Sequence, residues 1–163
     1  MNRPFDTKCA QLDDLLGVGR SFDMVSRELY VGGCRAKMWV VNGYAKDLLL
    51  ERTMEKLQAI GTLDGIRDVD ELLRRYNTVC DAETCRDRMQ AVTGVFSGST
   101  LLVVEGFDGD ILLDAKTCPT RSVQEPDAGK VLRGSHDGFV ENIMENAARL
   151  RRRIRDPALT LER

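Results

Sequence analysis

Residues 22–43 read FDMVSRELYVGGCRAKMWVVNG, and this stretch decides the fold. Two runs rich in β-branched and aromatic side chains, 23–31 and 35–41, flank the pair Gly32-Gly33, and such runs favour strands. A glycine pair between two strand-like runs is a strong turn signal. The stretch therefore predicts a β-hairpin.

C-terminal to this hairpin the pattern becomes helical. Apolar residues recur at helical spacing over residues 47–60, 68–76 and 87–96, which indicates three helices. Two short apolar runs, near 100–104 and 110–114, are separated by a glycine-containing loop and predict two more strands. We expect an α/β protein in which a small mixed β-sheet is flanked by helices.

Three segments give weaker signals. Residues 1–20 are irregularly patterned, and Gly17 and Gly19 should interrupt any helix, so we predict an N-terminal extension there. Residues 77–86 are polar and predict a loop. Residues 114–137 lack periodicity and contain several prolines and glycines. A loop of that length is uncommon in a compact domain and is usually functional.

The clearest helical pattern spans residues 137–155 and predicts a long amphipathic helix. Its apolar side chains recur with a period near 3.6. They are Phe139, Val140, Ile143, Met144, Ala147, Leu150 and Ile154. The chain is therefore expected to have three parts: an extension over 1–20, an α/β subdomain with the hairpin and the Pro/Gly-rich loop over 21–135, and an arginine-rich helix and tail over 136–163.

Arginines crowd the end of this last helix, at positions 149, 151, 152, 153 and 155. Cations near a helix C-terminus are stabilising by about 0.3–1 kcal/mol each, so a purely structural role is open. Contact with a protein or with an anionic membrane leaflet is a second interpretation, and nucleic acid is a third. The chain has 24 basic and 26 acidic residues and only 6% aromatics, which disfavours nucleic acid.

The composition is typical of a soluble globular protein of one or two small domains, with 163 residues, 42% hydrophobic and 31% charged. No apolar run approaches the roughly 20 residues that span a bilayer, and no signal peptide is evident. The five cysteines are odd in number and irregularly spaced. We expect them to be reduced thiols, and we expect the chain on its own to be soluble.

Familiar catalytic and ligand-binding patterns are incomplete. The GVG triplet at 17–19 lacks the third glycine of a dinucleotide fingerprint, because that position is Phe22. His136, the single histidine, lies between Ser135 and Asp137, and adjacent side chains point apart, which disfavours a catalytic triad. The aspartates within 108–114 do not follow the spacing of a calcium loop. We expect no catalytic centre, cofactor or metal.

A longer pattern runs through the last third of the chain. It comprises Pro119, Arg121, Glu125, Pro126, Arg133, Gly134, Gly138, Phe139, Glu141, Asn142, Arg152, Arg153 and Arg155. In this order the residues are similar to the motif of GerA-type spore germination proteins. The segments SREL at 26–29 and VVNG at 40–43 also resemble the first strand pair of that family. Within the family, GRSFD at 19–23 looks closer to the stage V sporulation AF branch than to the receptor A subunits.

The resemblance covers nearly the whole chain and implies a cytoplasmic N-terminal domain that precedes a multi-pass domain in the inner membrane of the spore. It implies two related α/β subdomains, of which this would be the first. Because the chain ends before any membrane segment, we expect a truncated product or a fragment. The family supplies no catalytic residue here, so the motif residues are expected to be structural or to contact a partner.

The function implied by the resemblance is non-enzymatic, in assembly or signalling of the machinery that couples nutrient sensing to ion release. The implied partners are other germination proteins of the same membrane assembly, with a homo-oligomer and an inner-leaflet contact through the arginine cluster as further expectations. No cofactor and no nucleic acid are implied. The alternative is a soluble regulatory binding module unrelated to membranes.

Overall fold

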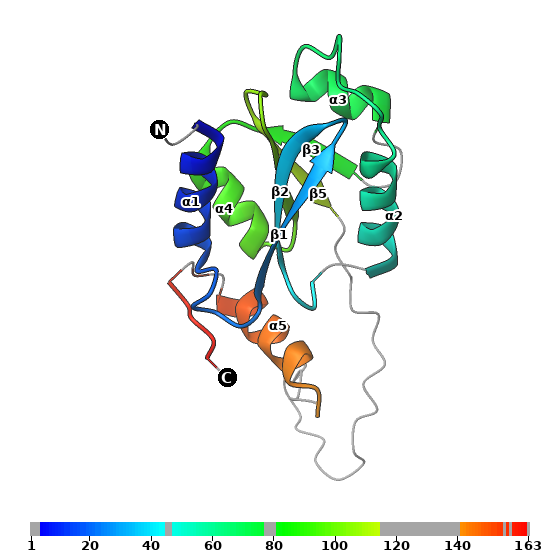
Figure 1. Cartoon of the computed structure of the whole chain (residues 1–163). Coiled ribbons are helices and arrows are strands. Elements are labelled where there is room, and N and C mark those ends of the chain that lie inside the picture. Colours follow the sequence, from blue (N-terminus) through cyan, green and yellow to red (C-terminus); the bar gives the residue numbers. More distant parts are fainter. Residues whose placement is uncertain are drawn as a thin grey trace.

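The computed structural model describes residues 4–44, 47–76, 81–114, 141–154, 156 and 158–162. In chain order they form α1 (Pro4–Leu16), β1 (Met24–Val31), β2 (Cys34–Val41), α2 (Asp47–Gln58), α3 (Val69–Tyr76), β3 (Asp81–Cys85), α4 (Arg88–Phe96), β4 (Thr100–Val104), β5 (Asp110–Asp114) and α5 (Ile143–Ile154). Figure 1 shows the strands at the centre, α1 and α4 on one side, α2 and α3 on the other, and α5 at one end.

The strands form one five-stranded sheet in the order β1-β2-β4-β5-β3. The predicted hairpin is confirmed: β1 and β2 pair antiparallel from Met24↔Val41 to Val31↔Cys34. The turn between them is made by Gly32 and Gly33, whose φ angles of 53° and 82° favour glycine. Gly32 also abuts Leu63, so close that a Cβ atom there would lie 2.6 Å from the leucine Cγ.

The two faces of the sheet bury separate cores, because side chains alternate along each strand. On β2, Trp39 and Val41 pack with α1 and α4, whereas Met38 and Val40 pack with α2 and α3. The strand β4 is buried along its whole length and contributes to both cores. The apolar run that follows Thr100, LLVV, is what a central strand covered on both faces requires.

The predicted α/β class is confirmed, and the predicted strands and helices of the central part lie within a few residues of those observed. The relative direction of the strands differs from the prediction: the described strand pairs are all antiparallel, whereas a mixed sheet was expected. The predicted polar loop over 77–86 is also wrong in part, because residues 81–85 form β3. This edge strand alternates between exposed and more buried positions, and its polar composition, DAETC, suits a strand that faces solvent.

The N-terminal residues do not form an irregular extension. They form α1, whose buried side chains follow helical spacing. These are Phe5, Cys9, Leu12 and Leu16. Gly17 and Gly19, with φ angles of 73° and 79°, follow the helix and end it instead of interrupting it.

The last helix begins later than predicted. Residues 141 and 142 are not helical, and Asn142 caps α5 by accepting a hydrogen bond from the Met144 backbone N–H at 2.9 Å. Residues 137–140 lie outside the described part. Among the described members of the predicted apolar stripe, Ala147 is buried and Met144 half-buried, whereas Ile143, Leu150 and Ile154 are exposed. Ala148 and Arg151, which were not part of the predicted stripe, face the core as well.

Candidate functional site

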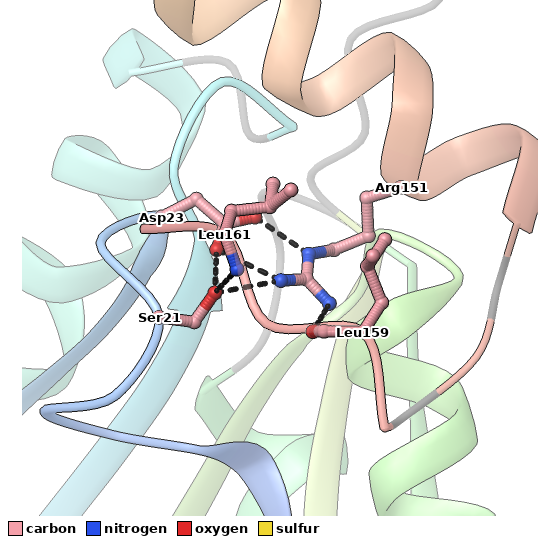
Figure 2. Close-up of polar contacts among 5 residues, drawn as sticks. All are labelled: Ser21, Asp23, Arg151, Leu159 and Leu161. Atoms are coloured by element: carbon pink, nitrogen blue, oxygen red, sulfur yellow. Dashed lines mark hydrogen bonds and ion pairs between the residues drawn. The ribbon is translucent and has the colours of Figure 1, made fainter. Parts of the chain in front are cut away.

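Arg151 lies in the last turn of α5, is completely buried, and is surrounded by oxygen acceptors (Figure 2). Its Nε donates to Oδ2 of Asp23 at 2.5 Å, and its Nη2 donates to Oδ1 of the same carboxylate at 2.9 Å. Nη2 also reaches Oγ of Ser21 at 2.9 Å, and Nη1 reaches the carbonyl oxygen of Leu159 at 3.1 Å. We call Ser21, Asp23 and Arg151 the arginine clamp.

Both buried charges of the clamp are paired and hydrogen-bonded. Asp23 is as fully buried as Arg151, and the two form a fork-to-fork pair in which both carboxylate oxygens are bound. Ser21 donates its hydroxyl proton to Asp23 at 2.7 Å, and the guanidinium lies 5.0 Å from the ring of Phe96. Burying a charge is costly unless it is paired and hydrogen-bonded. These contacts meet that condition, so the clamp can hold distant segments together.

The clamp joins three segments far apart in sequence. Asp23 directly precedes β1, and Arg151 is 128 residues further along on α5. The third segment is the C-terminal one: the Leu161 backbone N–H donates to Ser21 Oγ at 2.9 Å, and the Phe22 N–H donates to the Leu161 carbonyl at 3.0 Å. The direction of the C-terminal segment is therefore fixed by hydrogen bonds to the α1–β1 loop.

A close backbone approach positions α5 for this contact. Gly43, which follows β2, has a φ of 85°, and a Cβ atom there would lie 3.3 Å from Ala148 Cβ and 3.4 Å from the Met144 carbonyl oxygen. The neighbouring ring of Tyr44 lies 5.0 Å from the Arg152 guanidinium. A glycine at the turn lets α5 approach the sheet end closely enough for Arg151 to enter the core.

A second set of charges fastens α1 to the sheet, and we call it the α1 seam. Arg35 pairs with Asp6 at 2.6 Å, Lys37 with Asp13 at 2.6 Å, and Lys8 with Asp110 at 2.5 Å. Trp39 Nε1 also donates to Asp13 at 2.7 Å. In contrast to the clamp, most of these side chains are partly exposed.

Burial alters the pKa of two titratable groups at this seam. It raises the pKa of the Asp110 carboxyl, against the lowering effect of the hydrogen bond and charge of Lys8. Burial also raises the pKa of the Cys9 thiol to about 11, although Lys37 lowers it. A thiol with so high a pKa is not a nucleophile at neutral pH.

Most of the predicted motif lies outside the described residues: Pro119, Arg121, Glu125, Pro126, Arg133, Gly134, Gly138, Phe139 and Arg155, together with His136. The remaining four lie in or next to α5. Glu141 and Arg153 are exposed, Asn142 caps the helix, and Arg152 stacks on Tyr44.

The sequence prediction missed the clamp. It treated Arg151 as one member of a surface cluster and did not single out Ser21 or Asp23. A signal was present, because Arg151 lies three and four residues after Ala148 and Ala147 and so shares their helix face. An arginine on the face of two small apolar residues indicates burial, whereas Arg153 lies off that face.

In the described part of the chain, no three His, Cys, Asp or Glu side chains are grouped as metal ligands. Within the same residues, no helix combines the length and apolarity needed to cross a bilayer.

The family model described as Bacillus/Clostridium GerA spore germination protein matches residues 10–163. The chain belongs to the GerA family. Stage V sporulation protein AF of Bacillus subtilis (strain 168) is 35% identical to this GerA chain over 150 residues, which are 90% of the chain and 30% of that protein. Spore germination protein B1 of the same organism is 41% identical over 68 residues, which are 42% of the chain and 14% of that protein.

The fold of this GerA-family chain is also that of a solved structure. The N-terminal domain of the A subunit of the Bacillus megaterium spore germinant receptor GerK3 aligns with a TM-score of 0.68 and 19% identity, over 94% of this chain and 56% of that one. The chain thus spans about 30% of the length of the stage V sporulation relative and about half of the solved domain.

Proposed function

We propose that this chain is a non-enzymatic module of the spore germination machinery that acts in assembly or signalling. The arginine clamp is the observation that carries the proposal. In the clamp, a completely buried ion pair and its hydrogen bonds hold α5 and the C-terminal segment against the start of β1. Such an arrangement suits a rigid scaffold, since the buried guanidinium is occupied by Asp23, Ser21 and a backbone carbonyl.

The names of its relatives support a setting for this module. They are named as sporulation and spore germination proteins, and about 70% of the length of the stage V sporulation relative lies outside the matched part. A module with a fixed C-terminal direction would transmit a displacement to such a neighbouring part. We place the module on the cytoplasmic face of the spore inner membrane, with other germination proteins of that assembly, or further copies of the chain, as its partners.

The proposal is tested in a spore-forming host that carries the gene. Spores that lack the chain should lose optical density more slowly, or not at all, after nutrients are added. The wild-type gene should restore the rate, and Asp23→Asn should restore it less well than the matched change Asp6→Asn, which alters a partly exposed carboxylate of the α1 seam. His136→Ala should restore it fully, because no catalytic role is proposed for this histidine.

An immunoblot of the spores separates loss of function from loss of protein. Deletion spores that germinate with the wild-type time course would contradict the proposal. So would full loss of the response in His136→Ala spores that hold normal amounts of the protein, since this would indicate a reactive centre.

A further inference from the structure

Strand β1 lies at one edge of the sheet formed by the described residues, so one side of its backbone faces away from β2. The Asn42 N–H donates to the Asp23 carbonyl at 2.7 Å, and these two residues are one step beyond the Met24↔Val41 pair. Hydrogen-bonded and non-hydrogen-bonded pairs alternate along an antiparallel ladder. The odd-numbered residues of β1 therefore bond to β2, whereas the even-numbered residues direct their N–H and C=O groups outward.

A hydrogen bond on the far side of β2 supports this assignment. The Glu105 N–H donates to the Arg35 carbonyl at 2.7 Å, so the backbone of Arg35 is directed toward β4. Arg35 is the partner of Tyr30 on β1. Because Arg35 faces β4, the backbone groups of Tyr30 point away from the sheet.

Three outward-facing residues of β1 have free backbone groups. The Met24 N–H is occupied, because it donates to the Ser21 carbonyl at 3.3 Å. For Ser26, Glu28 and Tyr30, no hydrogen bond within the described part of the chain reaches the outer side of the backbone. We call these three residues the β1 edge.

The side chains along the β1 edge are also accessible. Tyr30 is 65% exposed, and Arg27 and Glu28 are both exposed on opposite faces of the sheet. Neither of these two charges forms an ion pair with another described residue. A free strand edge is a template for a further strand, and here it carries two unpaired charges at adjacent positions.

We propose that the β1 edge binds an extended segment of a partner protein, which adds to the sheet antiparallel to β1. The backbone groups of the edge would supply affinity, and the side chains specificity. Opposite charges directly across a strand pair are favourable and like charges are not. The segment therefore carries a basic residue opposite Glu28 and, next to it, an acidic residue opposite Arg27. This inference goes beyond the proposed function, because the edge accepts such a strand whatever process the module serves.

Charge argues against a second copy of this chain as the occupant. Two copies related by a twofold axis would pair antiparallel, with outward residues opposite outward residues. The register that engages the whole β1 edge places Glu28 opposite its own counterpart, and the neighbouring register does the same with Arg27. Registers centred further along leave one end of the edge unpaired. The register that joins Arg27 to Glu28 is one residue out of phase with the hydrogen bonds.

The test uses two synthetic peptides, each as long as the eight-residue strand β1 and made of threonine and valine around one lysine and one glutamate. In the first peptide the lysine meets Glu28 and the glutamate meets Arg27; in the second the two are exchanged. The purified, isotope-labelled chain is titrated with each peptide to millimolar concentration, and amide shifts are followed by NMR. We expect the first peptide to shift the amides of the β1 edge and to bind more tightly than the second.

Two variants locate the contact. Ser26→Pro removes an outward N–H and leaves the ladder to β2 intact, since proline is tolerated where the N–H of an edge strand faces solvent. It should weaken binding about tenfold, whereas the matched Ser26→Ala, which keeps the N–H, should bind like the wild type. Arg27→Glu/Glu28→Lys leaves the backbone unaltered and should reverse the preference between the two peptides. Circular dichroism checks the fold of each variant.

Four outcomes would overturn the inference. The first is that neither peptide shifts the amides of the β1 edge. The second is unchanged binding of a folded Ser26→Pro variant, and the third is an unchanged peptide preference of Arg27→Glu/Glu28→Lys, which decides the matter alone if the proline variant does not fold. The fourth is a dimer in sedimentation that Ser26→Pro abolishes, which would assign the edge to a second copy. The deletion phenotype of spores judges the proposed function separately.

Discussion

The arginine clamp and the α1 seam use the same chemistry in different surroundings. In the clamp, Asp23 and Arg151 are both completely buried, whereas in the seam the paired side chains of Asp6 and Arg35 are 39% and 33% exposed. Water screens the charges of the seam but not those of the clamp. Ion pairs of similar length therefore contribute differently to the stability of the fold. The comparison teaches that burial, more than the number of ion pairs, decides which contact holds the domain in its shape.

The largest expected effect comes from removing one charge of the clamp. Asp23→Asn should lower the free energy of unfolding by about 3–5 kcal/mol, because it leaves the Arg151 guanidinium buried without its counter-charge. Asp6→Asn in the α1 seam should lower it several-fold less. Urea denaturation followed by circular dichroism measures both variants. Equal losses would erase the distinction between the two regions.

A double replacement sharpens this result. Asp23→Leu/Arg151→Met replaces the buried pair with apolar side chains, and it should be more stable than Arg151→Met alone, which leaves an unpaired carboxylate. If the double variant is the less stable of the two, desolvation of the lone charge is not the reason for the loss.

An intermediate effect is expected at the turn that admits α5. Gly43→Ala forces an alanine to adopt a φ of 85° and brings its Cβ within 3.3 Å of Ala148. The backbone alone should cost about 1–2 kcal/mol. Gly19→Ala is the matched control, because it has a φ of 79° and nothing within 4 Å of the added Cβ. Thermal unfolding should show a larger loss of stability for Gly43→Ala than for Gly19→Ala. An equal loss would indicate that α5 shifts away from the added methyl group at no cost in free energy.

The smallest effect is the pH dependence of the seam residue Asp110. Burial raises the pKa of its carboxyl above the ordinary value, so the folded state holds this proton more tightly than the unfolded state. Stability from this group is therefore greatest below the ordinary pKa of about 4, and it falls as pH rises from there through the raised pKa. Asp110→Asn should flatten that decline in urea denaturation measured across pH. Asp108→Asn should flatten it to a lesser extent, because the charge of Asp108 adds to the raised pKa of Asp110. The exposed Asp64→Asn should leave it unchanged, and identical profiles for Asp110→Asn and Asp64→Asn would show that another group is responsible.

The part of the fold that could be predicted is the part coded by local pattern. The runs at 23–31 and 35–41 and the Gly32-Gly33 turn predict the hairpin, and β4 and β5 follow from short apolar runs. Edge strand β3 was missed because its residues are mostly polar and face solvent, so they lack the apolar pattern that identifies a strand. Helix α1 was missed because two glycines that end it look like glycines that break it.

The candidate site shows the same division. The sequence alone determined the family motif, the amphipathic last helix and the crowding of arginines at its end. Only the tertiary structure decided which arginine enters the core, since the rotation of α5 depends on Asp23, 128 residues away, and on the close approach at Gly43. A helical pattern constrains neighbours three and four residues apart, whereas the burial of a charge depends on a counter-charge that the fold brings from elsewhere.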